Sequence, residues 1–566
     1  MIDFKGEVVK LIDREVESLS KEDIVPLIET PPSYDMGDYA FPAFRLAKEL
    51  KTAPNIIAEQ LSEKFSVSDY FEKVENKGPY INFFINRQKL VETVLDEIVD
   101  AKENFGATNI GEGGNVIVEF SSPNIAKPFH IGHIRSTVIG NSIYQIYKFL
   151  GFDTVAINHL GDYGTQFGML ITAYKMWGDR EVIEADPIAE LLKLYVRFNK
   201  EAEDDEELKD RARYWFKELE NKNEEAVELW KWIRDISLKD FNRVYDLLGI
   251  KFDSFAGESF YSDMMPEVLK EMEEKKLLEE SQGAQIVDLE PYDMPPALIK
   301  KKDGSTLYTT RDITAALYRK KHYDFYKNIY VVASQQNLHF KSWIKIVELM
   351  GYEWANDCVH VPFGMVSLED GTLSTRKGRV VFLEDVLNKA VERTEQIIED
   401  RNPDLENKKE VAKDIGIGAV IFQELFNQRI KDYVFSFDRT LSFEGETGPY
   451  VQYTHARTYS LLEKGDFNLE DKVDYSLLTS EDEIDIIRLL YNFDNVIVDA
   501  GEKYEPYFIT RHIVELAKAF NKYYNNTQIN IEDKELKGAR LMLVYAVKNV
   551  IKIGLGLLGI KAPNKM

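Results

Sequence analysis

The stretch SSPNIAKPFHIGH, residues 121–133, lies between two segments that predict different secondary structures. The segment before it, VIVEF at 116–120, is short, apolar and rich in β-branched residues, which predicts a buried strand. The segment after it, 134–150, repeats apolar residues at helical spacing and stops before Gly151, which predicts a helix. The stretch is therefore predicted to connect the end of a strand to the start of a helix.

Two histidines, His130 and His133, stand at this predicted helix start. The start of a helix carries a partial positive charge and exposed N–H groups, so it favours anions. No carboxylate occurs between Glu119 and Asp153, which leaves the local charge favourable to phosphate. The histidine spacing alone would favour an ordinary loop with two incidental histidines. Together with the strand, the helix and the absent acids, it favours a nucleotide-phosphate site.

Composition limits the class of protein. The chain has 566 residues, enough for several domains, and its one cysteine, Cys358, excludes an internal disulfide and a multi-cysteine zinc site. We expect no structural metal. No apolar run is long enough to span a bilayer, and the N-terminus lacks a signal-peptide pattern, so we expect no membrane partner and a reducing cytoplasmic location.

The formal net charge of −26 argues at first against a nucleic-acid partner. The acids are concentrated, however, in segments such as 201–207, whereas 534–565 is basic with Glu535 as its only acid. Residues 376–379, RKGR, form a second basic cluster. A binding surface needs only a local basic patch, although these clusters also fit ordinary solvated surfaces.

The pattern of elements predicts a multidomain α/β protein. Strands expected at 116–120, 154–158 and 329–333 alternate with helices, which predicts a doubly wound parallel sheet with ligands at the carboxyl ends of the strands. Neither a GxGxxG fingerprint nor a Walker loop is present.

Three domains are expected along the chain. Residues 1–110 predict a small N-terminal α+β domain, and 111–410 the parallel-sheet domain, with an acidic helical insertion at about 175–290. Residues 411–566 predict a C-terminal all-α bundle, in which apolar spacing favours helices over 415–435 and 481–500 among others.

The string from Val118 to His133 resembles the signature of class I aminoacyl-tRNA synthetases, and the arginyl-tRNA synthetase version in particular. This resemblance implies a Rossmann-like catalytic domain in which His130, Gly132, His133 and Lys127 bind ATP. The segment HLGDYG at 159–164, after the second predicted strand, is similar to a family loop beside the adenylate, which adds Gly161 and Asp162 to the ATP-binding residues. An ordinary glycine-rich turn with a capping Asp is the alternative.

Tyr308 and Asp312 are four residues apart, so one helix can place them on one face. A carboxylate pairs best with the planar fork of a guanidinium, which makes Asp312 the first choice for reading arginine. An Asp in the first turn of a helix is also common without any ligand. The family resemblance implies that Asp312, Tyr308 and Gln336 hold the substrate side chain. It also implies that the substrate amino group lies near residues of the first strand and loop, namely Glu119, Ser121 and Asn124.

The second class I signature, a Lys-Met-Ser-Lys loop that steadies pyrophosphate, corresponds to residues 371–379. Thr372 and Thr375 replace both consensus lysines. The charge of pyrophosphate must still be neutralised, and the resemblance suggests Lys127 first. Arg376 and Lys377 are the alternative, although they fit a solvated basic turn equally well.

Residues 446–457 look like the start of the family's anticodon-binding bundle, which implies tRNA contacts by Tyr450, Arg457 and Arg511. The aromatic residues of this region could stack splayed bases, but each one taken singly fits a bundle core better. Residues 1–110 are similar to the N-terminal domain that binds the outer corner of the tRNA, with a packing module as the alternative.

The resemblance implies an arginine–tRNA ligase that uses ATP with Mg²⁺, L-arginine and the tRNA specific for arginine. The arginine carboxylate attacks the α-phosphate of ATP, and the 2′-hydroxyl of the terminal adenosine then takes the arginyl group. We expect a monomer. Two alternatives stay open: another class I synthetase, such as a cysteine or glutamine enzyme, and a tRNA-binding paralogue without catalysis.

Overall fold

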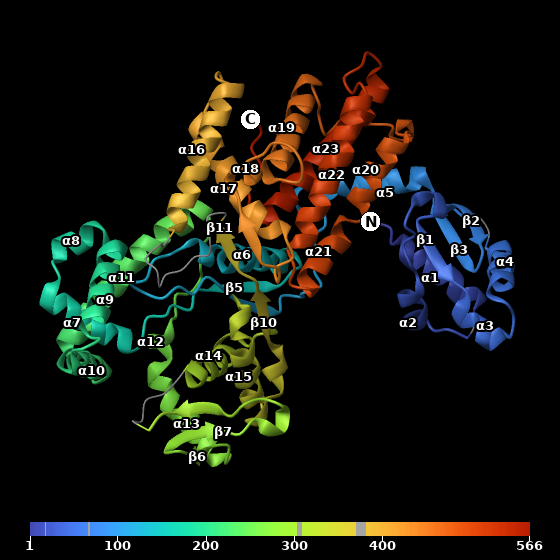
Figure 1. Cartoon of the computed structure of the whole chain (residues 1–566). Coiled ribbons are helices and arrows are strands. Elements are labelled where there is room, and N and C mark those ends of the chain that lie inside the picture. The colour runs from blue at the N-terminus through green and yellow to red at the C-terminus, as the bar shows by residue number, and fades with distance from the viewer. Residues whose placement is uncertain (17, 66–67, 303–307, 369–380) are drawn as a thin grey trace. The chain divides into compact units, whose positions relative to one another are not determined.

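A computed structural model describes residues 1–16, 18–65, 68–302, 308–368 and 381–566. These residues form two compact units. Their helices and strands are labelled in Figure 1. The first unit contains 1–105, 457–493 and 515–553, and the second contains 106–456, 494–514 and 554–566. The predicted ATP and arginine residues all belong to the second unit.

A four-stranded parallel sheet organises the second unit. It consists of β4 (Asn115–Glu119), β5 (Asp153–Ile157), β9 (Lys327–Ala333) and β10 (Cys358–Phe363), in the order β10-β9-β4-β5. The predicted parallel sheet is confirmed. β10 is an addition, because its sequence CVHVPF mixes buried and half-buried residues at the sheet edge instead of forming an apolar run.

Helices cover both faces of this sheet. α14 (Tyr308–Tyr323) and α15 (Asn337–Leu349) pack Ile313 and Trp343 against Ile117 of β4. α6 (Ile134–Phe149) packs on the other face, where a Cβ atom at Gly140 would lie 2.1 Å from Phe120. Because side chains alternate along a strand, Glu119 shares the α14 face with Ile117.

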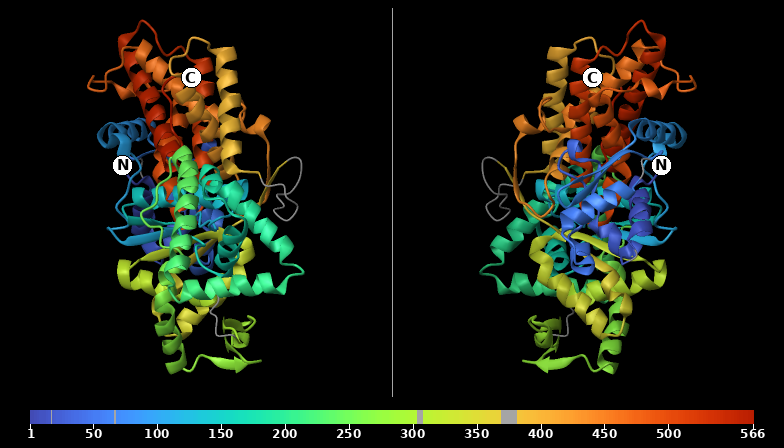
Figure 2. Two further views of the ribbon diagram at one scale, coloured as in Figure 1. Left: turned by 90° about the vertical axis from the view of Figure 1, so that its left-hand side faces the viewer. Right: turned by 90° about the vertical axis from the view of Figure 1, so that its right-hand side faces the viewer.

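The insertion is helical over most of its length. Its helices are α7 (Thr165–Trp177), α8 (Arg180–Ala185), α9 (Pro187–Glu201), α10 (Glu206–Glu220), α11 (Glu224–Leu248), α12 (Glu258–Tyr261) and α13 (Met265–Glu274). Its end departs from the prediction, because β6 (Glu279–Ser281), β7 (Ala284–Val287) and β8 (Ala297–Lys300) form an antiparallel sheet. These light-green strands lie apart from the parallel sheet in Figure 2.

The helix predicted over 415–435 is shorter than expected. α17 (Lys408–Phe426) ends where Asn427 turns to extended backbone, and residues 433–435 form β12 (Tyr433–Phe435), which pairs with β11 (Val366–Leu368). The predicted helix over 481–500 is two helices, α20 (Glu481–Tyr491) and α21 (Phe493–Glu502). The other helices of the C-terminal half are α16 (Leu383–Arg401), α18 (Phe437–Thr440), α19 (Gly448–Lys464), α22 (Tyr507–Asn526) and α23 (Lys534–Leu557).

The first unit contains a three-stranded antiparallel sheet in the order β1-β3-β2, formed by β1 (Tyr39–Pro42), β2 (Phe71–Lys77) and β3 (Tyr80–Ile85). Its N-terminal helices are α1 (Phe4–Glu15), α2 (Lys21–Ile24), α3 (Phe44–Leu50), α4 (Pro54–Lys64) and α5 (Arg87–Ala101). Phe4, Phe41, Phe71 and Phe83 are fully buried, so this unit has its own core. Throughout the described ranges of both units, no helix is long and apolar enough to cross a membrane.

Candidate active site

The loop between β4 and α6 has an unusual backbone. Ser121, Ser122 and Ala126 hold φ values of 69°, 48° and 60°, in the left-handed region that non-glycine residues rarely occupy. Such conformations persist only where surrounding structure enforces them, and they cluster at functional sites. The loop therefore has the backbone character of a ligand site.

Hydrogen bonds orient both histidines of this loop. Nδ1 of His130 accepts from the Gly132 N–H at 3.0 Å, and Nδ1 of His133 accepts from the His130 N–H at 3.2 Å. His130 therefore carries its proton on Nε2, whereas Nδ1 of His133 also lies 3.3 Å from the His130 carbonyl and donates to it in the other tautomer. Burial lowers the pKa of His130. Burial also lowers the pKa of His133, to about 3, and electrostatic repulsion from His130 and Lys127 contributes to that shift. At neutral pH both rings are therefore neutral N–H donors, and the positive charge of this loop comes from Lys127.

Backbone hydrogen bonds connect the segment after residue 380 to the loop between β4 and α6, residues 120–133, which we call the histidine loop. The Ile131 N–H donates to the Val381 carbonyl at 3.1 Å, and the Leu383 N–H donates to the Phe129 carbonyl at 2.9 Å. The predicted residues Arg376 and Lys377 lie outside the described residues. Val381 and Leu383, the described residues with these two hydrogen bonds, thus lie against the histidine loop.

The segment after β5 meets the same loop. The Ile125 N–H donates to the Gly161 carbonyl, and the Gly161 N–H donates to the Pro123 carbonyl, both at 3.1 Å. A Cβ atom at Gly161 would lie 2.2 Å from Oδ1 of Asn124, so glycine is required for this approach. Two of the predicted residues, Gly161 and Asn124, are thus neighbours.

Asp162 is fully buried and its carboxylate already has protein partners. It accepts from the Ser259 N–H at 2.8 Å, from the Ser259 hydroxyl at 2.7 Å and from Nε of Arg234 at 3.2 Å. These contacts fasten the β5 loop to the insertion. Direct ATP binding by Asp162 stays a prediction. Its observed contacts indicate that it stabilises the segment that contains Gly161.

Tyr308 and Asp312 lie on the first turns of α14, as their spacing predicts. The Asp312 side chain is 26% exposed and pairs with Nε2 of His339 at 2.5 Å. Tyr308 is 65% exposed, and Gln336, just before α15, is also exposed. Asp312 thus has an orienting partner on one side and access to solvent, as a ligand-reading carboxylate needs.

Glu119 ends β4 and is largely buried, with Oε2 2.6 Å from Nη1 of Arg319. Ser121, two residues later, is buried in a hydroxyl network: Oγ lies 2.8 Å from the Tyr245 hydroxyl and accepts from Thr137 at 3.0 Å. Asn124 is exposed. Of the three residues predicted near the substrate amino group, Asn124 is the open one, and Glu119 and Ser121 are held by neighbours.

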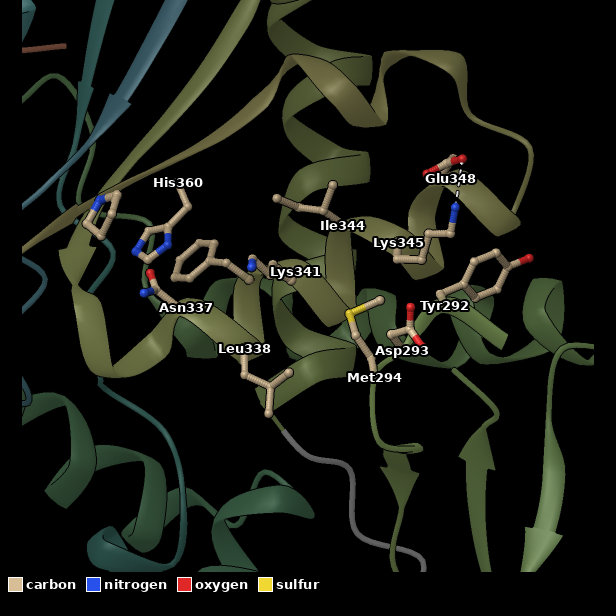
Figure 3. A pocket seen from close by; sticks show the side chains of 12 residues that line it. Tyr292, Asp293, Met294, Asn337, Leu338, Lys341, Ile344, Lys345, Glu348 and His360 are labelled. Carbon is tan, nitrogen blue, oxygen red and sulfur yellow. Dashed lines mark hydrogen bonds and ion pairs between the residues drawn. The ribbon is translucent and has the colours of Figure 1, made fainter. Parts of the chain in front are cut away.

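A pocket of about 750 Å³ lies beside α15 (Figure 3). His360 of β10 stacks on Phe340 at its wall, with 4.1 Å between ring centroids. Its lining contains neither Asp312 nor the two histidines of the loop. It is therefore a separate hollow on the α15 side of the sheet.

The predicted tRNA-binding residues lie on two helices, Tyr450 and Arg457 on α19 and Arg511 on α22. Tyr450 is half-buried on α19. Arg457 donates to the side chain of Asn521 and lies 4.7 Å from the ring centroid of Tyr524. In the second unit, Arg511 pairs with Glu446 at 2.9 Å and stacks 4.0 Å from the Phe426 ring centroid. Both arginines thus lie over aromatic rings.

Three family models match the chain: the arginyl-tRNA synthetase N-terminal domain at 6–85, the catalytic domain of class I tRNA synthetases (R) at 94–437, and the DALR anticodon-binding domain at 451–566. The chain belongs to the arginyl-tRNA synthetase family. The prediction from the string at 118–133 is thereby confirmed, as are the predicted fold class and the expected ATP-dependent arginine–tRNA ligase activity of the family.

Individual arginyl-tRNA synthetases and their relatives agree over the whole length. The chain is 66% identical to an arginine–tRNA ligase of Halothermothrix orenii and 58% identical to one of Clostridioides difficile, each over 100% of both chains. It is similar to the crystal structure of arginyl-tRNA synthetase from Plasmodium falciparum, with a TM-score of 0.82 and 25% identity over 100% of both chains.

Sequence reasoning missed the partners of the predicted acids. Arg319 holds Glu119, His339 holds Asp312, and Arg234 holds Asp162. The sequence offered one signal, for Arg319. It lies seven residues after Asp312, which is two turns along the same helix, so it shares a helix face with a predicted site residue. The other two partners come from elements far away in the chain.

Proposed function

We propose that this synthetase activates L-arginine with Mg²⁺-bound ATP and transfers the arginyl group to the 2′-hydroxyl of the terminal adenosine of the tRNA specific for arginine. The observation that carries the proposal is the continuity of two sites. Glu119 ends β4, and the histidine loop begins at the next residue. A substrate amino group at Glu119 would thus lie beside a nucleotide held by that loop.

ATP binds at the start of α6. His130 donates its Nε2–H group to a phosphate oxygen, since its Nδ1 atom already accepts a backbone bond, and His133 contacts the phosphates beside it. Lys127 adds positive charge, Gly132 leaves room for the His130 ring, from which a Cβ atom would lie 2.8 Å, and Gly161 shapes the opposite wall. Mg²⁺ arrives with the phosphates as part of the substrate.

Arginine binds between α14 and the end of β4. Asp312 takes the guanidinium, with Tyr308 and Gln336 beside it, and Glu119 with Asn124 receives the α-ammonium. The substrate carboxylate then attacks the α-phosphate, and pyrophosphate leaves. No side chain forms a covalent bond, so the rate comes from alignment and charge stabilisation, of which alignment contributes about 7–11 kcal/mol.

Lys127 compensates first for the missing signature lysines, with Arg376 and Lys377 as the second source of charge. Lys127 lies in the same loop as the two histidines, which supports its place as the first source of charge. The tRNA is bound by the N-terminal domain and by Tyr450, Arg457 and Arg511 in the C-terminal helices. The enzyme acts in the cytoplasm as a monomer.

Aminoacylation with labelled arginine and total tRNA tests this function. We expect arginine to be charged and lysine to be rejected, because a pocket built for a fork-shaped cation leaves its carboxylate poorly paired with an ammonium. Binding of tRNA without charging at any Mg²⁺ concentration would instead identify a non-catalytic paralogue.

A further inference from the structure

We infer that Arg319 is a positioning residue that makes Glu119 selective for the α-ammonium of arginine and so decides which end of the substrate enters which side of the site. The inference rests on the proposed role of Glu119. Arg319 is fully buried, and the proposed reaction does not otherwise use it.

Arg319 is completely buried at the centre of several elements. From α14 it reaches Glu119 at the end of β4, with 2.6 Å between Nη1 and Oε2. Its Nη2 lies 3.4 Å from Nδ1 of His159, the residue that opens the segment after β5. The ring centroids of Tyr330 on β9 and Tyr261 on α12 lie 5.5 and 5.9 Å from its Cζ. The guanidinium is thus contacted by residues of four other segments, although its Nε and Nη1 atoms have no hydrogen-bond partner among the described residues.

This contact changes what Glu119 can bind. Arginine carries two cations, a guanidinium and an ammonium, and the proposed function assigns them to two carboxylates, Asp312 and Glu119. A guanidinium pairs best with both oxygens of a carboxylate, whereas an ammonium is a compact charge that needs one. Because Arg319 already contacts Oε2 of Glu119, a guanidinium would share that oxygen with another cation, whereas an ammonium can be satisfied by Oε1. Glu119 therefore suits the ammonium, and the guanidinium is left to Asp312.

The spacing on α14 supports this division. Asp312 and Arg319 are separated by two helical turns, so one rigid helix carries the group that attracts the guanidinium and the group that keeps it from Glu119. Asp312 has a histidine partner instead, His339, at 2.5 Å. The two carboxylates are thereby made unequal by their partners.

A substrate analogue separates this role from a structural one. The analogue, 5-guanidinopentanoic acid, is arginine without its α-amino group, so it keeps the guanidinium contact and lacks the ammonium contact. We would measure the KM for arginine and the inhibition constant of the analogue in ATP–pyrophosphate exchange with tRNA present. Wild type, Arg319→Met, Arg319→Lys and Glu119→Gln would be compared.

Arg319→Met should raise the KM for arginine about 10- to 100-fold, the value of one hydrogen bond to a charged group, while the inhibition constant of the analogue stays within about threefold. Glu119→Gln should give the same pattern, and the double variant should be no worse than the single ones. Arg319→Lys keeps the charge without the contact to His159 and should fall between wild type and Arg319→Met.

Arg488→Met is the matched control, since it breaks a comparably buried pair, with Asp38 at 2.9 Å, in the first unit. It should lower the melting temperature and leave the KM for arginine unchanged. If Arg319→Met does not fold, Arg319→Lys and the double variant, which leave no unpaired buried carboxylate, make the same comparison.

Equal loss of arginine and analogue binding in the folded Arg319 variants would show a merely structural residue and overturn the inference, as would unchanged binding of both. A wild-type enzyme without arginine-dependent exchange would instead overturn the proposed function. A shift in Glu119→Gln without one in the Arg319 variants would leave that function standing and remove only the role of Arg319.

Discussion

Replacing Asp312 with asparagine removes the charge that reads the substrate side chain and keeps the size of the residue. Truncating one partner of a hydrogen-bonded charge pair costs about 2–5 kcal/mol when the pair is buried. The Asp312 side chain is 26% exposed, so water replaces part of the lost interaction and the low end of that range applies. A loss of about 2–3 kcal/mol corresponds to about a 30- to 150-fold higher KM for arginine.

The assay is arginine-dependent ATP–pyrophosphate exchange with tRNA present, repeated with lysine. Asp312→Asn should narrow the preference for arginine over lysine, because asparagine offers one acceptor oxygen and no charge to the guanidinium fork. Asp324→Asn is the matched control, since Asp324 lies just beyond the same helix with its side chain 88% exposed. A normal arginine KM in Asp312→Asn, or an equal change in the control, would refute the assignment.

Three further changes test the nucleotide side of the site. Lys127→Ala should lower adenylate formation about 10²- to 10³-fold, because the positive charge that neutralises the leaving pyrophosphate is lost. Binding of tRNA, measured by filter retention, should stay constant, and equal losses of both would contradict this. Gly161→Ala should raise the KM for ATP about 10- to 100-fold, because the new methyl group would lie 2.2 Å from Oδ1 of Asn124; Gly556→Ala, which has open space around it, should leave the KM unchanged. Finally, because burial lowers the pKa of His133 to about 3, the unfolded chain binds a proton that the folded chain does not. Stability should therefore be lost as pH falls from about 6.5 towards 3, by up to about 1.4 kcal/mol per pH unit, and His133→Gln should show a smaller drop in melting temperature from about pH 7.5 to about pH 5 than wild type.

The strand, loop and helix around residues 121–133 were predictable because each has a strong local pattern. The strand expected at 116–120 is β4 (Asn115–Glu119), and the helix expected at 134–150 is α6 (Ile134–Phe149). The placement of Tyr308 and Asp312 on one helix also followed from local spacing. Local pattern was thus enough where an element is buried over its length.

Pairing between distant segments was not predictable in the same way. The apolar spacing that favours a helix through 435 continues past the true end of α17 at Phe426, because residues 433–435 are apolar for a different reason: they pair with β11, far earlier in the chain. The partners of the predicted acids have the same origin, since His339 reaches Asp312 from another helix. Which charge meets which is decided by tertiary packing and not by spacing along the chain.

A crystal structure with arginine and a non-hydrolysable ATP analogue would test the central claim most directly. The account predicts the triphosphate against His130, His133 and Lys127, the guanidinium at Asp312 and the ammonium at Glu119. A nucleotide bound elsewhere, or a guanidinium at Glu119 with Asp312 facing away from the ligand, would contradict it.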